Sequence, residues 1–368
     1  MSKHKIAYLC VSNSWGGLEM NQLRNALWMQ ERGHEVLLLG LKNSKIINEA
    51  ESENIKTRHV KQHRKYYDVK RASKLAKLLR KDRITHLIIR DPKDISLSVT
   101  AKRILRNKLH LSYFMEMQLG IKKTDMVHTF RFRGLDLWSC PLHFLANQVK
   151  RLTHFETSNI QIIPSGIHLA QFKNAPTKLD ARKRLQLSEN KMLIGLIGRL
   201  DPFKGQMLLL DAFEELPDHI KKNIEVVFLG DKMSPDIDHF YDRLHQRIST
   251  KTLQNSVRIL PFRKDVELFY AAMDVTVMAS KAETFGMVTI ESMACGTPVI
   301  GSNAGGTPEL IGNNERGLLF QTMDAISLSQ AIASFYKGLS FDPNLLKLYA
   351  QNFSHVEVCR MVEEQLCL

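Results

Sequence analysis

Two glutamates, Glu283 and Glu291, stand eight positions apart on either side of the dipeptide Phe285-Gly286. An ionised carboxylate only accepts hydrogen bonds, and it can take them from two neighbouring hydroxyl groups. The pair therefore suits a hydroxyl-rich ligand. Two glutamates on an ordinary protein surface can show the same spacing, so the spacing alone leaves that alternative open.

Arg199 and Lys204 form a second candidate pair in the run Gly198-Arg199-Leu200-Asp201-Pro202-Phe203-Lys204-Gly205. The preceding apolar residues predict a buried strand, which places both cations at its carboxyl end, beside the start of a helix. Two cations at this position suit a diphosphate group. Taken as isolated charges, they are more often part of a solvated surface.

The elements around the glutamates follow the order strand, loop, helix. An apolar run rich in β-branched residues at 274–279 predicts a buried strand, and helical spacing follows over 287–295. Gly296 is placed to end that helix, 298–301 predicts the next strand, and Thr307 is placed to cap a further helix. Alternating strands and helices indicate a parallel sheet, whose ligands bind outside the carboxyl ends of the strands.

The glutamate region resembles a known family over a long ungapped stretch. Glu283 to Glu291, then Ala294-Cys295-Gly296-Thr297-Pro298 and Gly305-Gly306-Thr307-Pro308-Glu309, is similar to the E-x7-E region of the retaining GT-B glycosyltransferases of family 4 (glycosyl transferases group 1). The Arg199 to Gly205 run matches a second motif of that family. The resemblance is specific over 190–311 and looser before 165.

The resemblance implies roles for particular residues. Arg199, Lys204 and Glu283 would be the catalytic residues, with the two cations on the donor diphosphate and the glutamate beside the donor sugar. Glu291 would hold the ribose. The remaining donor contacts would come from Phe262, Arg263, Phe285, Gly286, Met287 and Val288.

The first half carries weaker signals. Gly16, Gly17 and Glu19 lie in a glycine-containing loop after a predicted first strand, and a tight turn is by itself the better explanation of such a loop. In the family this loop faces the cleft, so we include both glycines among the donor-binding residues. Members of the family commonly carry a histidine at the end of the strand predicted at 109–117. Glu116 and Gln118 stand there instead, and with Glu19 they become possible sugar or acceptor contacts. We assign no catalytic base.

The net charge of +14 is unevenly distributed. Residues 1–165 hold 30 Lys and Arg against 14 Asp and Glu, whereas 166–368 hold 22 against 24. The segment 68–81 predicts a basic amphipathic helix, which suits either a solvated face or contact with an anionic surface. The excess favours an anionic partner for the first half.

No metal or cofactor is expected. The five cysteines are odd in number and form no close pair, which favours free thiols, and the histidines show no ligand spacing. Asp236-Ile237-Asp238 has the form of a metal-binding D-x-D motif, but its polar surroundings favour a turn before a helix. Metal-independent chemistry is the expectation.

The predicted fold class is α/β, with two facing doubly wound, Rossmann-like domains of the GT-B type. The predicted boundaries are an acceptor-side domain at 1–165, a nucleotide-sugar-binding domain at 166–345, and a C-terminal helix at 346–368 that crosses back to the first domain. A polar segment with a proline at 173–177 favours a linker near the first boundary.

The resulting functional prediction is an enzyme, a retaining hexosyltransferase. It would move a sugar from a nucleotide-sugar, with UDP favoured, to an anionic glycan or glycolipid in bacterial cell-surface polysaccharide or lipopolysaccharide synthesis. No apolar run is long enough for a membrane span, so we expect a cytoplasmic location with peripheral contact at an anionic membrane. The alternatives are a catalytically silent relative that binds a nucleotide-sugar and a nonspecific nucleic-acid-binding protein; no specific nucleic acid is expected as a partner.

Overall fold

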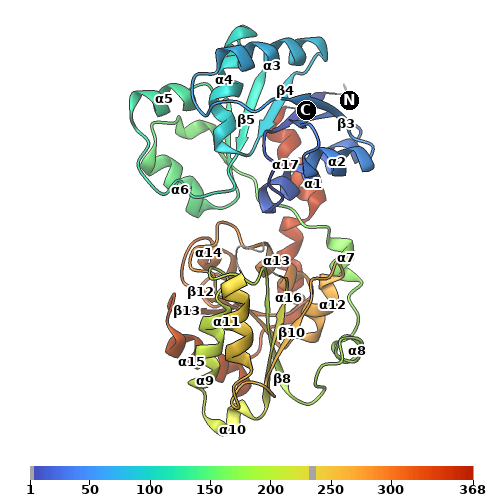
Figure 1. The fold of residues 1–368 in the computed structure, drawn as a ribbon, viewed down its shortest axis with the longest axis vertical. Coiled ribbons are helices and arrows are strands. Elements are labelled where there is room, and N and C mark those ends of the chain that lie inside the picture. The colour runs from blue at the N-terminus through green and yellow to red at the C-terminus, as the bar shows by residue number, and fades with distance from the viewer. Residues whose placement is uncertain (1–3, 232–237, 368) are drawn as a thin grey trace. The chain divides into compact units, whose positions relative to one another are not determined.

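The computed structural model describes residues 4–231 and 238–367, and the chain divides into two compact units (Figure 1). The first contains Met1–Gly166 and His355–Leu368, and the second contains Ile167–Ser354. From the sequence, we predicted that the chain returns to the first domain after residue 345. In the structure that position falls inside helix α16 (Pro343–Ala350), which belongs to the second unit, and only helix α17 (His355–Leu366) joins the first.

The first unit is built on a seven-stranded parallel sheet with the order β3-β2-β1-β4-β5-β6-β7. The five inner strands consist mostly of buried apolar residues, as expected when helices cover both faces, whereas the edge strands β3 and β7 are more exposed. The strands are β1 (Lys5–Cys10), β2 (Glu35–Leu41), β3 (Lys56–Val60), β4 (His86–Ile89), β5 (His110–Phe114), β6 (Leu137–Cys140) and β7 (Ile160–Ile162).

Helices pack on both faces of this sheet, and each face has its own apolar core. One core contains side chains of the later helices, and the other contains side chains of the first two helices and of α17. The helices are α1 (Gly17–Glu31), α2 (Lys45–Ser52), α3 (Val69–Lys81), α4 (Ile95–Ile104), α5 (Met126–Phe132) and α6 (His143–Leu152). The basic segment predicted at 68–81 is α3, with Asp68 as its cap and its apolar stripe buried.

Helix α17 is fixed to the first unit by apolar and ionic contacts. Cys359 and Val362 are fully buried in the core that also holds α1 and α2. The carboxylate of Glu363 accepts two hydrogen bonds from the guanidinium of Arg32, at 2.7 and 2.5 Å, and lies 3.0 Å from His34 Nε2. Residues more than 300 positions apart therefore stabilise one another here.

The second unit is built on a six-stranded parallel sheet with the order β10-β9-β8-β11-β12-β13. Its strands are β8 (Met192–Ile197), β9 (Ile224–Leu229), β10 (Val257–Leu260), β11 (Val275–Met278), β12 (Val299–Ser302) and β13 (Gly317–Phe320). Because β8 and β11 are direct neighbours, the loops after their carboxyl ends lie side by side.

Two helices of the second unit precede its first strand, and the others follow strands of the sheet. They are α7 (Leu169–Lys173), α8 (Lys178–Arg184), α9 (Gln206–Glu214), α10 (Asp218–Lys221), α11 (Asp238–Ile248), α12 (Val266–Ala272), α13 (Met287–Ala294), α14 (Thr307–Ile311) and α15 (Ala325–Tyr336), with α16 after them. Gly296 has a φ of +80° directly after the C-cap of α13, as predicted. Thr307 was predicted to cap α14, which is wrong: Gly306 is the cap, and Thr307 is the first helical residue.

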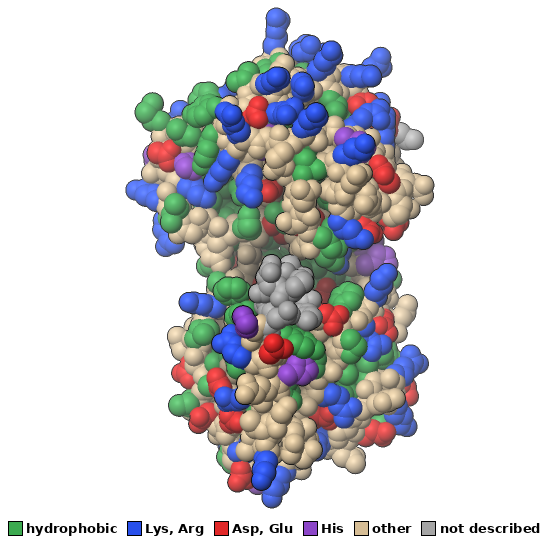
Figure 2. Space-filling view, viewed as in Figure 1, with side chains coloured by type: hydrophobic (Ala, Val, Ile, Leu, Met, Phe, Trp, Pro, Cys, Tyr) green, Lys and Arg blue, Asp and Glu red, His purple; other side chains and the backbone are tan. Residues whose placement is uncertain are grey.

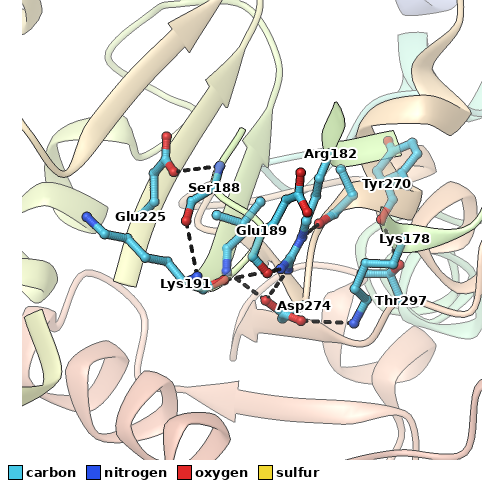
Figure 3. A network of polar contacts seen from close by, with 11 residues as sticks. Lys178, Arg182, Ser188, Glu189, Lys191, Glu225, Tyr270, Asp274 and Thr297 are labelled. Atoms are coloured by element: carbon cyan, nitrogen blue, oxygen red, sulfur yellow. Dashed lines mark hydrogen bonds and ion pairs between the residues drawn. The ribbon is translucent and has the colours of Figure 1, made fainter. Parts of the chain in front are cut away.

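A polar network fastens α8 to the amino ends of the strands in the second unit (Figure 3). The carboxylate of Asp274 accepts hydrogen bonds from Arg182 Nη2 at 2.6 Å, Lys178 Nζ at 2.9 Å and the backbone N–H of Leu193 at 2.7 Å. Arg182 is buried and donates its other hydrogen bonds to the backbone carbonyls of residues 189, 191 and 272. Every polar group in this cluster has a partner, so we interpret it as structural.

Candidate functional site

The turn between β8 and α9 presents Arg199 and Lys204 at the carboxyl edge of the second sheet. Gly205 caps α9 with a φ of +84°, and a Cβ there would lie 2.5 Å from the Cβ of Ala279, so the turn packs directly against the end of β11. The Arg199 side chain is 50% exposed and lies 3.4 Å from the carboxylate of Asp201. A half-exposed guanidinium with a weak partner can still bind an incoming anion.

Lys204 and Glu283 meet across the two neighbouring strands. Lys204 Nζ donates to Glu283 Oε2 at 3.0 Å, and the two side chains are 27% and 21% exposed. The pair joins residues 79 positions apart, from the loop after β8 and the loop after β11. Partial exposure leaves both groups accessible to a ligand, and the ion pair keeps each side chain in place.

The backbone around Glu283 is held by the glycine turn that precedes α14. The N–H of Gly306 donates to the carbonyl oxygen of Glu283 at 2.9 Å. At Gly305, which has a φ of +63°, a Cβ would lie 2.1 Å from that same oxygen. Only glycine allows this approach, which explains why two glycines follow the strand β12.

Helix α13 begins beside Glu283 with an uncapped N-terminus. Its N-cap is Gly286, with a φ of +90°, which has no side chain to cap the helix. Met287 and Val288 occupy the first turn and are partly exposed, whereas Phe285 is buried and packs 5.8 Å from the ring of Phe353. Free N–H groups and the positive end of the helix dipole favour an anion at this place.

Glu291 lies one turn further along α13, where Tyr270 of α12 positions it. The Tyr270 hydroxyl donates to Glu291 Oε2 at 2.7 Å. Burial, and next the charge of Glu291, raises the pKa of Tyr270, so the phenol stays a hydrogen-bond donor. The structure therefore brings Arg199, Lys204, Glu283 and Glu291 to one edge of one sheet, around the start of one helix.

Phe262 and Arg263 follow β10 on the same edge of the sheet. The Phe262 ring is exposed, whereas the Arg263 guanidinium donates two hydrogen bonds to Asp265 at 2.7 and 2.6 Å. The exposed ring is available to stack on a flat ligand group. The guanidinium already has a carboxylate partner.

In the first unit, Glu19 stabilises its own loop. The Glu19 carboxylate is buried and accepts hydrogen bonds from Ser12 Oγ at 2.8 Å and from the N–H of Gly16, the cap of α1, at 3.0 Å. Gly17 is the first helical residue. These hydrogen bonds give Glu19 a structural role that needs no ligand: its carboxylate holds the loop before α1 in place.

Glu116 and Gln118 lie beyond the end of β5 among polar partners. Glu116 pairs with Arg90 and accepts a hydrogen bond from Asn21 Nδ2 at 3.2 Å. Burial raises the pKa of Glu116, against the opposing effect of Arg90. Gln118 accepts a hydrogen bond from Gln148 Nε2 at 3.0 Å.

A buried pair at the carboxyl edge of the first sheet, His63 and Asp94, was not predicted from the sequence. His63 Nε2 lies 2.7 Å from Asp94 Oδ1, and His63 Nδ1 lies 2.8 Å from the carbonyl oxygen of Arg64. Both partners are acceptors, which favours the doubly protonated imidazolium. Burial on its own would lower the pKa of His63, but the hydrogen bonds to Asp94 and Arg64 outweigh it and raise the pKa. The two residues are 31 positions apart, and the only local hint is an aspartate before a helix.

Among the described residues, we find neither a metal site nor a helix that could span a membrane. Within 4–231 and 238–367, no three His, Cys, Asp or Glu side chains come together as a metal site. Of the D-x-D run, Asp236 and Ile237 lie outside the described residues, and Asp238 begins α11. The five cysteines are free thiols. In the same described ranges, every helix is too short or too polar to cross a bilayer.

Comparisons of sequence show that the second unit is similar to known glycosyltransferases. The family described as Glycosyl transferases group 1 matches residues 177–347. A D-inositol 3-phosphate glycosyltransferase of Streptomyces bingchenggensis is 30% identical over 201 residues, which are 53% of this chain and 43% of that protein. One of the same name from Corynebacterium jeikeium is 31% identical over 181 residues, 48% of this chain and 43% of that protein. The matched stretch thus spans less than half the length of these relatives.

Comparisons of structure cover both units. Anabaena HepE in complex with UDP superposes with a TM-score of 0.86 over 99% of each chain, at 22% identity. A glycosyltransferase from Rickettsia africae has the same TM-score at 19% identity, with 100% of this chain and 98% of that chain covered. The predicted fold class is confirmed: the chain consists of two parallel-sheet, Rossmann-like units of the GT-B type.

Proposed function

We propose that this protein is a retaining glycosyltransferase that moves a hexose from a nucleotide-sugar, UDP-linked by preference, to an anionic glycan or glycolipid. The observation that carries the proposal is the Lys204–Glu283 ion pair beside the uncapped start of α13, with Glu291 one turn along the same helix. The match of residues 177–347 to glycosyl transferases group 1 and the likeness to UDP-bound HepE support it.

In this proposal Lys204 and Arg199 bind the diphosphate of the donor. As the bond between sugar and diphosphate breaks, negative charge grows on the leaving group, and cations already in place stabilise that charge. The N-terminus of α13 adds its dipole in the same direction. These groups replace the charge that a metal ion would supply, so we propose that turnover is metal-independent.

The two glutamates divide the recognition of hydroxyl groups. Glu283 accepts hydrogen bonds from the transferred sugar, and Glu291, held by Tyr270, accepts them from the ribose. Phe262 lies exposed for contact with the base. In retaining transfer the donor phosphate can take the acceptor proton, so the proposal needs no histidine base in the first unit.

The charge of the first unit supports an anionic acceptor. This unit holds 31 Lys and Arg against 17 Asp and Glu, a net of +14, whereas the second holds 21 of each. Figure 2 shows Lys and Arg side chains spread over the visible face of the first unit. A glycolipid of a bacterial cell surface, as in polysaccharide or lipopolysaccharide synthesis, combines the required sugar with anionic groups.

Exposed apolar side chains among these cations support peripheral contact with an anionic membrane. Ile121, Met126 and Phe130 are 71%, 89% and 56% exposed on and before α5. Basic side chains near anionic lipid contribute about 1 kcal/mol each, enough for reversible binding. Flotation with vesicles of phosphatidylglycerol tests the contact, and vesicles of phosphatidylcholine alone are the control.

The first experiment on the donor site is thermal stabilisation by UDP-, GDP-, ADP- and CMP-sugars. At a hundred times its dissociation constant, a ligand stabilises the folded state by about 2.7 kcal/mol, which a melting curve resolves. We expect one nucleotide class to act on the wild type, and Arg199→Ala and Glu291→Ala to lose the effect. Lys222→Ala, an exposed lysine elsewhere in the second unit, is the matched control.

The outcomes separate the alternatives. If none of the four nucleotide classes shifts the wild-type melting curve, the donor site is assigned wrongly. A shift without sugar transfer or donor hydrolysis would instead identify a catalytically silent relative that binds a nucleotide-sugar.

A further inference from the structure

Three cations come together at the carboxyl edge of the first sheet: Lys65, Lys123 and Arg131. Lys65 Nζ lies 5.3 Å from the centre of the Tyr66 ring, and the guanidinium carbon of Arg131 lies 4.7 Å from the same centre. Burial, and then the charges of Lys65 and Arg131, lowers the pKa of Lys123. The three side chains are therefore close enough to repel one another, and we call them the cation cluster.

Arg131 is the buried member of the cation cluster. It is only 6% exposed, and burial lowers its pKa. Its Nη2 donates to the carbonyl oxygen of Pro92 at 2.9 Å, and its Nε has no hydrogen-bond partner among the described residues. A buried cation without a carboxylate costs free energy unless something else compensates it.

The charge of Asp125 acts on Arg131 and raises its pKa against the effect of burial, but the two form no ion pair. Asp125, the cap of α5, accepts hydrogen bonds from the backbone N–H of His128 at 3.0 Å and from its ring at 2.5 Å. Other buried cations of the same unit do have carboxylates, as in the pairs Arg90–Glu116 and Lys102–Asp136. Within the described residues, no member of the cation cluster forms an ion pair, so the missing partner is particular to this place.

The position of the cation cluster is one where ligands bind. Lys65 lies in the loop after β3, Pro92 in the 3-10 turn (Pro92–Asp94) after β4, and Lys123 before α5, which follows β5. All three segments leave the carboxyl ends of parallel strands, where open α/β sheets bind their ligands.

We propose that the cation cluster binds a phosphate monoester carried by the sugar acceptor. A dianionic phosphate compensates more of the positive charge than a carboxylate does, and it accepts hydrogen bonds from a guanidinium and two ammonium groups at once. The sugar-borne part of the inference rests on the proposed glycosyltransferase function. The anion site itself rests on the geometry of the first unit alone.

Isothermal titration of the full chain tests the site at constant ionic strength. Every protein carries Lys204→Ala, which weakens phosphate binding at the proposed donor site. The ligands are inorganic phosphate, glucose 1-phosphate, glucose 6-phosphate and inositol 1-phosphate. We expect saturable phosphate binding and at least one sugar phosphate that binds more tightly than inorganic phosphate.

Variants of the two accessible lysines identify the residues. Lys65→Ala and Lys123→Ala should each raise the dissociation constant about tenfold or more, as expected for a lost charge-assisted contact. Lys77→Ala, an exposed lysine of α3, is the matched control and should change nothing. Melting curves without ligand check that each variant folds.

Two kinds of result would overturn the inference. Absence of saturable binding, or an equal loss in Lys77→Ala, would show that the cation cluster is no anion site. If inorganic phosphate binds as tightly as every sugar phosphate, the proposal that the ligand is a sugar phosphate is wrong. Neither result depends on nucleotide-sugar binding, which the donor melting curves report separately.

Discussion

Arg182 and Arg131 are equally buried, at 6% exposed each, yet of the two only Arg182 forms an ion pair with a described carboxylate. Arg182 donates to three backbone carbonyls and to the carboxylate of Asp274 at the amino edge of the second sheet (Figure 3). Arg131, at the carboxyl edge of the first sheet, makes no ion pair with any described residue. A buried charge with its carboxylate serves the fold, whereas a buried charge without an ion pair costs stability, which is why we propose an anion site beside Arg131.

The largest effect on stability should come from removing the partner of Arg182. Asp274→Ala leaves a buried guanidinium without its carboxylate, so the free energy of unfolding should fall by about 3 kcal/mol. Urea denaturation measures the change. Lys178→Ala removes the exposed partner of the same carboxylate and should cost about 1 kcal/mol or less. Equal losses in the two variants would contradict the distinction between buried and exposed partners.

Lys204→Ala should separate function from stability. Loss of the cation at the proposed leaving group should lower kcat by about 10²- to 10³-fold, the range for one electrostatic stabiliser. The free energy of unfolding should change by about 1 kcal/mol or less, because the ion pair with Glu283 is partly exposed. Initial rates of sugar transfer and urea curves measure the two quantities. Unchanged turnover would exclude Lys204 from the reaction.

Arg131→Met provides the direct counterpart to Asp274→Ala. It removes an uncompensated buried charge and one hydrogen bond while it retains an apolar stem, so the free energy of unfolding should stay within about 1 kcal/mol of the wild type. The same urea series measures it. A loss as large as that of Asp274→Ala would mean that Arg131 is compensated within the fold, contrary to the anion site.

The smallest expected effect is the pH dependence of the His63–Asp94 pair. Because the folded pKa of His63 is raised above its ordinary value of 6.5, its contribution to stability is complete below that value. The contribution is lost as pH rises through the folded pKa. The stability difference between wild type and His63→Gln should therefore shrink from pH 6 to pH 9 in urea titrations. A difference that grows over this range would reverse the sign of the pKa shift.

Local sequence patterns predicted most elements around the donor site and misplaced one helix cap. In the second, apolar runs and glycines defined β8, β11, β12 and α13 to within about two residues, because each element is set by its own local pattern. Thr307 was misassigned at α14, because the preceding glycine turn approaches the carbonyl of Glu283 and caps the helix itself. Such a contact between distant loops leaves no local signal.

The sequence by itself determined the alternation of strands and helices, the excess of positive charge in the first half, and the two short motifs that contain Arg199 and Glu283. These depend on residue type and on spacing along the chain. Only the tertiary structure decided which charges are compensated. Lys204 meets Glu283, and Asp94 meets His63, whereas Arg131 meets no described carboxylate, because parallel strands bring together loops that are tens of residues apart. The strength of a charge's interactions depends on those neighbours and on its burial, which residue order does not specify.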